Sequence, residues 1–296
     1  MKKLIFQGVG TALVTPFIEH LINFEEYKKM LEFQIKSGAD SVIVCGTTGE
    51  SATMTMKEKK YLIRFAVNTV NKRIPVIAGT GTNCTQSSIE LSQYAESIGA
   101  DGLLVVTPYY NKATQAGIVE HYRQIASHVS LPIIVYNVPS RTGLNILPET
   151  CLELSKIPNI VAIKEASGDI SQIAQIAHLC QDQLTIYSGN DDQTIPILSL
   201  GGKGVISVVS NVLPHEMHLL TQLCLQGNFK KARELQRKLL PLMHLLFAEV
   251  NPIPVKEALN LIGFQAGIPR LPLTPCQKEH TQQIQKALQQ FSISIS

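Results

Sequence analysis

Eight short apolar runs, separated by stretches with helical patterning, constrain the fold of this chain more than any other feature. Each run is continuously apolar, as expected of parallel strands that helices cover. The midpoints of successive runs lie roughly 20 to 33 residues apart, about the length of one strand–helix unit. The predicted strands span residues 8–14, 41–45, 75–78, 102–106, 132–136, 160–164, 184–187 and 204–209.

The segments between these runs carry the apolar periodicity of helices. Residues Thr55 to Glu58 form a capping box, which marks the start of one of these helices. The predicted helices include residues 24–37, 55–71, 86–98, 116–128 and 171–179.

Eight strands that alternate with helices predict an α/β fold, a (β/α)8 TIM barrel. The alternative is a doubly wound sheet, which usually carries a G-x-G-x-x-G turn after its first strand. Here the first strand runs into Thr15-Pro16-Phe17, so the sequence favours the barrel.

The strand–helix period ends after Val209, and the rest of the chain is helical and strandless. We expect helices over residues 229–249, 254–262 and 276–291. The chain has 296 residues, which is near the upper limit for one hydrophobic core. The predicted organisation is a catalytic barrel over residues 1–226 and a C-terminal helical appendage over residues 227–296.

Charge and hydropathy exclude several classes of protein. Lysine and arginine number 26 against 23 acidic residues, a net charge of +3 that is spread along the chain, whereas a nucleic-acid binder would show a clustered basic face. No apolar run reaches the length of a membrane span. The apolar N-terminal segment is interrupted by Gln7-Gly8 and Pro16, too early for a signal peptide. We therefore expect a cytoplasmic protein that binds neither nucleic acid nor membranes.

The cysteines and histidines do not form a pattern typical of a metal site. The six cysteines lie at least 29 positions apart, which favours free thiols in a reducing compartment over disulfides or a zinc cluster. His215 and His218 could share a helix face, but no third ligand lies nearby in the sequence. We expect no metal and no cofactor.

In a barrel of this kind, the active site lies where the strands end and the following loops begin. This rule selects residues from distant parts of the sequence as neighbours in space. They are Gly46 to Glu50, Asn83, Tyr109, Tyr110, Tyr136, Arg141, Lys164, Gly189, Asn190 and Ile206.

Lys164 is the most informative of these residues, because it closes a predicted strand. If Val161 and Ile163 face the helices, alternation turns Ala162 and Lys164 into the barrel. An inward lysine loses hydration, which lowers its pKa from about 10.4 toward that of a nucleophilic amine. Such an amine forms a Schiff base with a carbonyl compound. The alternative, a lysine that extends from the strand end into solvent, stays open on this residue alone.

The other candidates supply complementary chemistry. The backbone N–H groups of the loop containing Thr47 and Thr48 could bind a small carboxylate, although such a string can also be a plain turn. Tyr136 could transfer protons, with simple packing as its alternative. Arg141 suits bidentate binding of a second carboxylate, unless it is a surface residue. Together these groups indicate an aldol-type condensation of a 2-oxo acid.

Three motifs resemble the dihydrodipicolinate synthase family, within the pyruvate-dependent class I aldolase superfamily that also contains N-acetylneuraminate lyase. They are Gly46-Thr47-Thr48-Gly49-Glu50-Ser51, Tyr136-Asn137-Val138-Pro139-Ser140-Arg141-Thr142-Gly143 and Ile163-Lys164-Glu165-Ala166-Ser167-Gly168. The resemblance extends over essentially the whole chain, including the helical tail. It implies a lyase that condenses pyruvate with L-aspartate 4-semialdehyde to 4-hydroxy-tetrahydrodipicolinate, in diaminopimelate and lysine biosynthesis.

The resemblance also implies a role for each matching residue. Lys164 would form the Schiff base with pyruvate, and Thr47 and Thr48 would hold the pyruvate carboxylate. Thr47 would join Tyr136 and Tyr110 in a proton relay, with Tyr110 supplied by a neighbouring subunit of a homotetramer built as a dimer of dimers. The remaining substrate-binding roles fall to Arg141, which would bind the semialdehyde carboxylate, and to the backbone at Gly189 and Ile206.

One region departs from the family members that lysine inhibits, which often carry histidine, histidine and glutamate at three positions. Here these positions hold Met56, Lys59 and Ser87. Met56 and Ser87 cannot offer the same charged contacts, and Lys59 would repel a lysine ligand. We therefore expect weak or absent feedback by lysine.

Two alternative functions remain at the level of the sequence. Another pyruvate-lysine aldolase, of the N-acetylneuraminate lyase or 2-keto-3-deoxygluconate aldolase type, would share Lys164, Tyr136 and the two threonines. Arg141 argues against it, because a polyol chain has less use for a guanidinium than a second carboxylate has. A barrel that binds a 2-oxo acid without turnover would need no proton relay.

Overall fold

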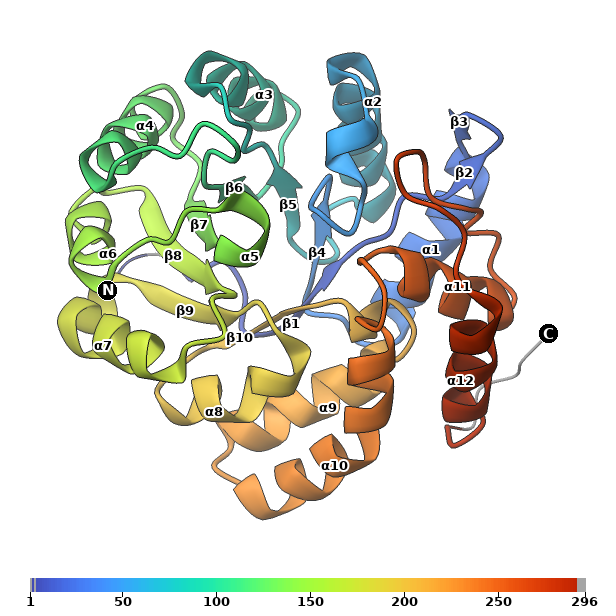
Figure 1. Cartoon of the computed structure of the whole chain (residues 1–296). Coiled ribbons are helices and arrows are strands. Elements are labelled where there is room, and N and C mark those ends of the chain that lie inside the picture. The colour runs from blue at the N-terminus through green and yellow to red at the C-terminus, as the bar shows by residue number, and fades with distance from the viewer. Residues whose placement is uncertain (1, 3, 292–296) are drawn as a thin grey trace.

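The computed structural model describes residue 2 and residues 4–291, and its centre is a closed barrel of parallel strands (Figure 1). The strands follow one another around the barrel in chain order, and β1 closes the ring by pairing with both β10 and β4. The fold is the predicted TIM barrel. Its strands are β1 (Gly8–Ala12), β4 (Ser41–Val44), β5 (Val76–Gly79), β6 (Gly102–Val106), β7 (Ile133–Asn137), β8 (Ile160–Glu165), β9 (Thr185–Ser188) and β10 (Gly204–Ser207).

The major helices form a ring around the barrel, and the five helices that the sequence predicted between the strands are all present (Figure 1). Thr55 caps α2 as expected, with both hydrogen bonds of the capping box to Glu58 present. The ring helices are α1 (Phe24–Lys36), α2 (Met56–Val70), α3 (Thr85–Ser97), α4 (Gln115–Ser127), α6 (Pro148–Ser155), α7 (Ile170–Cys180), α8 (Thr194–Ser199) and α9 (Pro214–Leu225). The short helix α5 (Pro139–Thr142) lies inside this ring, over the end of the barrel (Figure 1).

The three predicted C-terminal helices are present as α10 (Phe229–Leu245), α11 (Ile253–Leu261) and α12 (Lys278–Leu288). α10 lies against α9, outside the barrel, while α11 and α12 lie beside α1 and a small hairpin, β2 (Phe17–Ile18) and β3 (Leu21–Ile22) (Figure 1). The division of the chain at residue 227 stays a prediction, and residues 292–296 lie outside the described part.

Three of the predicted strands, β1, β4 and β10, end earlier than expected. At the ends of β1 and β10, side chains take up the backbone groups that would continue the ladder. The carboxylate of Asp191 accepts hydrogen bonds from the backbone N–H groups of Val208 and Val209, at 3.0 and 3.1 Å, beyond the end of β10. Asn211 accepts from the N–H of Val14 and donates to the carbonyl of Ala12, at 3.0 and 2.8 Å.

The alternation of β8 departs from the prediction at one residue. Ala162 belongs to the core inside the barrel and Ile163 to the core under the helices, as expected. Val161, however, also belongs to the inner core, so its predicted orientation is wrong. The reason is an irregularity in the β7–β8 pairing, where Ile133 faces Ile160 and Ile134 faces Ala162, so that Val161 is an extra residue in the ladder.

Aromatic side chains fill the N-terminal end of the barrel. The rings of Phe6 and Tyr187 stack with centroids 4.3 Å apart, and the Tyr187 hydroxyl donates to the Phe6 carbonyl at 2.6 Å. The opposite end, where the strands finish, is the end that carries active sites in this architecture. Among the described residues, no helix combines the length and the apolar character that crossing a membrane requires.

Candidate active site

Two adjoining cavities lie where the barrel strands end. The inner cavity has a volume of about 170 Å³ and includes Lys164 and Gly189 in its lining. The outer cavity, about 330 Å³, continues to Tyr109 and Leu273. An inner cavity of this size suits a small metabolite rather than a drug-sized ligand. Both cavities are lined by Gly46, Thr47, Leu104, Tyr136, Val138, Arg141 and Asn251.

Lys164 and Tyr136 are direct neighbours at the inner cavity. They lie opposite each other in the β7–β8 ladder, and Lys164 Nζ is 4.3 Å from the centroid of the Tyr136 ring. Lys164 is only 5% exposed and Tyr136 6% exposed. The amine therefore points into the barrel, as the strand pattern predicted, and not into bulk solvent.

Thr47 and Thr48 lie on a tight loop after β4 whose two ends are conformationally unusual. Cys45 and Glu50 flank this loop with φ values of 59° and 56°, in the left-handed region that non-glycine residues rarely adopt. Such backbone costs on the order of 1 to 3 kcal/mol per residue and is concentrated at functional sites. Thr48 is 2% exposed, while Thr47 is half-buried and faces the cavities.

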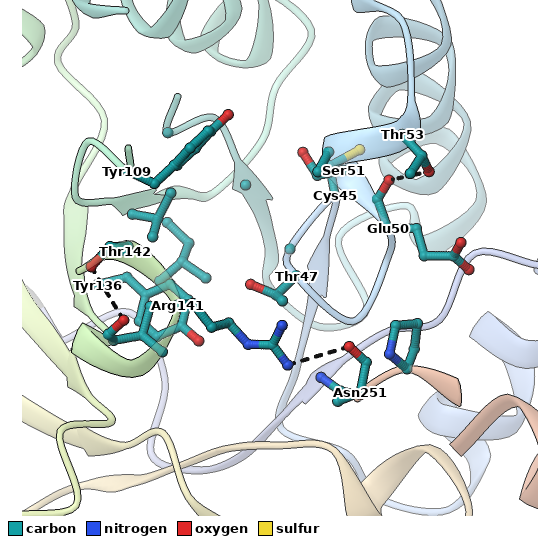
Figure 2. Close-up of a pocket in the computed structure, with 18 of the residues that line it drawn as sticks. Cys45, Thr47, Glu50, Ser51, Thr53, Tyr109, Tyr136, Arg141, Thr142 and Asn251 are labelled. Carbon is teal, nitrogen blue, oxygen red and sulfur yellow. Dashed lines mark hydrogen bonds between the residues drawn. The ribbon is translucent and has the colours of Figure 1, made fainter. Parts of the chain in front are cut away.

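Arg141 comes from the short helix α5 and crosses the mouth of the site (Figure 2). Its guanidinium donates to the backbone carbonyl of Asn251 at 3.3 Å. Asn251 in turn donates through its side-chain amide to the Thr48 hydroxyl, at 3.0 Å. The guanidinium thus lies in a position from which a carboxylate at the mouth could be bound.

Gly189 lies at the inner cavity because the chain approaches itself closely there. A Cβ atom at this position would be 2.6 Å from the Cβ of Ala166 and 3.0 Å from the carbonyl oxygen of Glu165. Ile206, also predicted for the pocket, is fully buried in the inner core and does not line either cavity, whereas Val208 does.

Asn83 and Tyr110 are two more predicted residues that line neither cavity. Tyr110 is the more informative of the two. Its side chain is 90% exposed, its φ is 74°, and it lines neither cavity. The preceding residue, Tyr109, lines the outer cavity instead. Within the described residues, Tyr110 therefore presents its side chain outward from its own barrel.

A buried carboxylate that the sequence analysis did not select lies near the amine. Asp191 is 3% exposed, and burial raises its pKa, while hydrogen bonds from Ser207, Val209 and Val208 and the charge of Lys164 oppose this rise. Asp191 directly follows the selected residues Gly189 and Asn190 in the sequence, and this position after a barrel strand could have indicated it as a site residue. Asn251 was missed because the run Asn251 to Pro254 interrupts the predicted helical tail, and nothing in that pattern indicated a return to the barrel mouth.

Cysteine and metal chemistry do not explain the site. Cys45 lines the outer cavity, but burial raises the pKa of its thiol to about 12, so the thiol is protonated at neutral pH. In the part of the chain that the structure describes, no group of three histidine, cysteine or acidic side chains could hold a metal ion. Lys164 is therefore the strongest candidate nucleophile at the site.

Comparison with known proteins identifies the family. Residues 5–291 match the model of the dihydrodipicolinate synthetase family. The chain belongs to this family. It is 56% identical over 292 residues to the 4-hydroxy-tetrahydrodipicolinate synthase of Caldicellulosiruptor saccharolyticus, covering 98% of this chain and 99% of that protein. It is 54% identical over 290 residues to the synthase of a Thermoanaerobacter species, covering 98% of each.

Solved structures of the family have the same fold. The dihydrodipicolinate synthase of Thermotoga maritima superimposes with a TM-score of 0.94 at 46% identity, covering 97% of this chain and 98% of that one. The enzyme of Aquifex aeolicus superimposes with a TM-score of 0.96 at 43% identity, covering 98% and 100%. The chain is an enzyme of the lyase class.

The thiols offer a test of the geometry around the loop after β4. In the native protein at pH 8, we expect iodoacetamide to label Cys84 first, because Cys84 is exposed and hydrogen bonds from Ser87 lower its pKa. Cys45 should resist, since a pKa of about 12 leaves about one thiolate in ten thousand at that pH. Peptide mass mapping over time measures both rates. The denatured chain is the control, and equal native labelling rates for the two thiols would contradict this description of the site.

Proposed function

We propose that Lys164 forms a Schiff base with pyruvate in the inner cavity, and that this adduct is the intermediate of the family's reaction. The chain condenses pyruvate with L-aspartate 4-semialdehyde to 4-hydroxy-tetrahydrodipicolinate, a reaction of diaminopimelate and lysine biosynthesis. The observation that carries the mechanism is the buried Lys164 amine, 4.3 Å from the ring centroid of Tyr136.

The proposed chemistry begins at the ketone carbon of pyruvate. The neutral amine of Lys164 attacks this carbon, water leaves, and the resulting iminium acts as an electron sink. Loss of a methyl proton then gives an enamine, whose carbon attacks the aldehyde of the second substrate. The amino group of that substrate attacks the imine carbon, which closes the ring and returns Lys164 to its free form.

The polar residues around the amine have matching roles in this proposal. Thr47 and Thr48 hold the pyruvate carboxylate, with the backbone at Gly189 completing the pocket. Thr47 and Tyr136 move protons to and from the intermediate. Arg141 binds the carboxylate of the semialdehyde at the mouth. That second carboxylate favours this reaction over cleavage of a sialic acid or a sugar acid, as the names of the relatives also do.

We further propose that Tyr110 completes the relay of a second subunit. Its exposed position at the rim, together with the continuation of the outer cavity away from Lys164, supports this arrangement. The active unit would then be a dimer, and the assembly a homotetramer of two such dimers. We expect the protein to work in the cytoplasm.

Replacing the nucleophile tests the mechanism. Lys164→Ala should lower kcat by at least about 1000-fold, because no other lysine is among the described residues that line the two cavities. Tyr136→Phe should lower kcat by about 100- to 10,000-fold through loss of a proton-transfer group. Steady-state assays with pyruvate and the semialdehyde measure both, with the exposed Lys156→Ala as control. Substantial turnover by Lys164→Ala would contradict the Schiff base, and faster cleavage of N-acetylneuraminate or 2-keto-3-deoxygluconate by the wild type would contradict the substrate assignment.

Subunit mixing tests the role of Tyr110. Lys164→Ala and Tyr110→Phe should each be nearly inactive alone. When the two are co-expressed, a mixed dimer has one site with an intact Lys164 and an intact Tyr110 from the other chain. Random pairing should then restore about a quarter of the wild-type sites. Activity of the mixture no higher than that of the separate variants would exclude a shared site.

Lysine titration tests the regulatory prediction. Met56 and Ser87 offer no charge, and Lys59 repels a lysine ammonium, so we propose that lysine inhibits weakly or not at all. Steady-state rates measured against L-lysine, with D-lysine as the ionic control, should stay nearly constant through the submillimolar range. Half-inhibition at submillimolar L-lysine would rule this out.

A further inference from the structure

The side chain of Glu50 points away from Thr47 and Arg141 (Figure 2). It is 1% exposed. Its Oε1 accepts a hydrogen bond from Lys256 Nζ at 2.8 Å, and its Oε2 accepts one from the backbone N–H of Arg270 at 2.8 Å. The carboxylate therefore joins the loop after β4 to two separate segments of the C-terminal region.

Lys256, on α11, is equally buried, and its ammonium group is fully satisfied. Besides Glu50, Nζ donates to the backbone carbonyls of Thr15 and Ile268, at 3.1 Å each, so that its three N–H groups all have acceptors. The ammonium also lies 4.4 Å from the centroid of the Phe17 ring. Thr15 follows β1 and Glu50 follows β4, so this one ammonium group connects the loops after these two strands with the C-terminal region.

The backbone of Glu50 closes the turn that carries the two threonines. Its N–H donates to the carbonyl of Thr47 at 3.0 Å, and its φ of 56° is costly for a residue with a side chain. The carbonyl of Gly49 accepts from the Thr15 hydroxyl at 2.7 Å. A turn that is intrinsically unfavourable needs such external contacts to stay in one conformation.

Net stabilisation is a weak explanation for this ion pair. Burial is the largest influence on Lys256 and lowers its pKa, although the charge of Glu50 and the hydrogen bond to it act in the opposite direction. Buried ion pairs can often be replaced by apolar residues of similar volume without loss of stability. The distinctive property of this pair is that it connects the Thr47–Thr48 turn to α11.

We propose that Glu50 and Lys256 are positioning residues of the active site, which hold Thr47 and Thr48 in the arrangement that receives the pyruvate carboxylate. This inference rests on the proposed function of the two threonines. Asn251, which donates to the Thr48 hydroxyl, provides a second connection from the same region.

The test separates positioning from stability with two variants and a matched control. Lys256→Met leaves a buried carboxylate unpaired and should lower both the melting temperature and the affinity for pyruvate. The double variant Glu50→Gln/Lys256→Met removes both charges and should recover much of the melting temperature. The control is Glu26→Gln. Glu26 is also buried, pairs with Lys29 at 2.9 Å and accepts from the Gln265 N–H at 2.9 Å, but lines neither cavity.

The positioning role predicts that KM for pyruvate rises about tenfold or more in both the single and the double variant. KM for the semialdehyde should change by less than about twofold, because Arg141 is untouched. Glu26→Gln should lower the melting temperature while leaving KM for pyruvate within about twofold of wild type. If Lys256→Met does not fold, the double variant and Glu50→Gln alone provide the same comparison.

Two results would overturn the inference: an unchanged KM for pyruvate in the variants, or a KM that returns to the wild-type value as the double variant regains stability. Failure of the proposed function is distinguishable from either result. If the wild type gives no covalent adduct at Lys164 when pyruvate and borohydride are added, the mechanism itself is wrong. If the wild type forms the adduct and KM does not respond, only the positioning role is wrong.

Discussion

The orientation of Lys164 depends on one irregular pairing in the barrel sheet. Ile160 and Ile163 both face the helices, and Ala162 faces the interior, because Val161 is an extra residue between them. In a regular strand that began with Ile160 facing the helices, Lys164 would also face outward, since side chains alternate with a period of two. The bulge at Val161 thus places the amine inside the barrel and beside the Tyr136 ring.

The fold could be predicted almost completely because each strand–helix unit carries its own local signal. The capping box at Thr55 and the eight apolar runs are examples. Alternation along β8 also predicted the inward direction of Lys164, but regular alternation placed Val161 on the wrong face. A bulge depends on the pairing of two strands, which a pattern read along one strand cannot contain.

The composition of the site was less accessible than the fold. Motifs that follow the strands pointed to Thr47, Tyr136, Arg141 and Lys164, and the structure brings these residues together. Asn251 and Lys256 form hydrogen bonds with the loop after β4, although they are more than two hundred residues from it in the sequence. No local sequence pattern predicts such contacts. The C-terminal helices therefore form part of the surroundings of the site as well as covering the barrel.

The proposed mechanism requires a covalent adduct between the Lys164 amine and pyruvate. The adduct is detected by treating the intact enzyme with pyruvate and borohydride, digesting it, and mapping the peptide masses. We expect a stable pyruvate-derived adduct on the peptide containing Lys164, and none when pyruvate is omitted. An unmodified Lys164, or an adduct at another lysine alone, would contradict it.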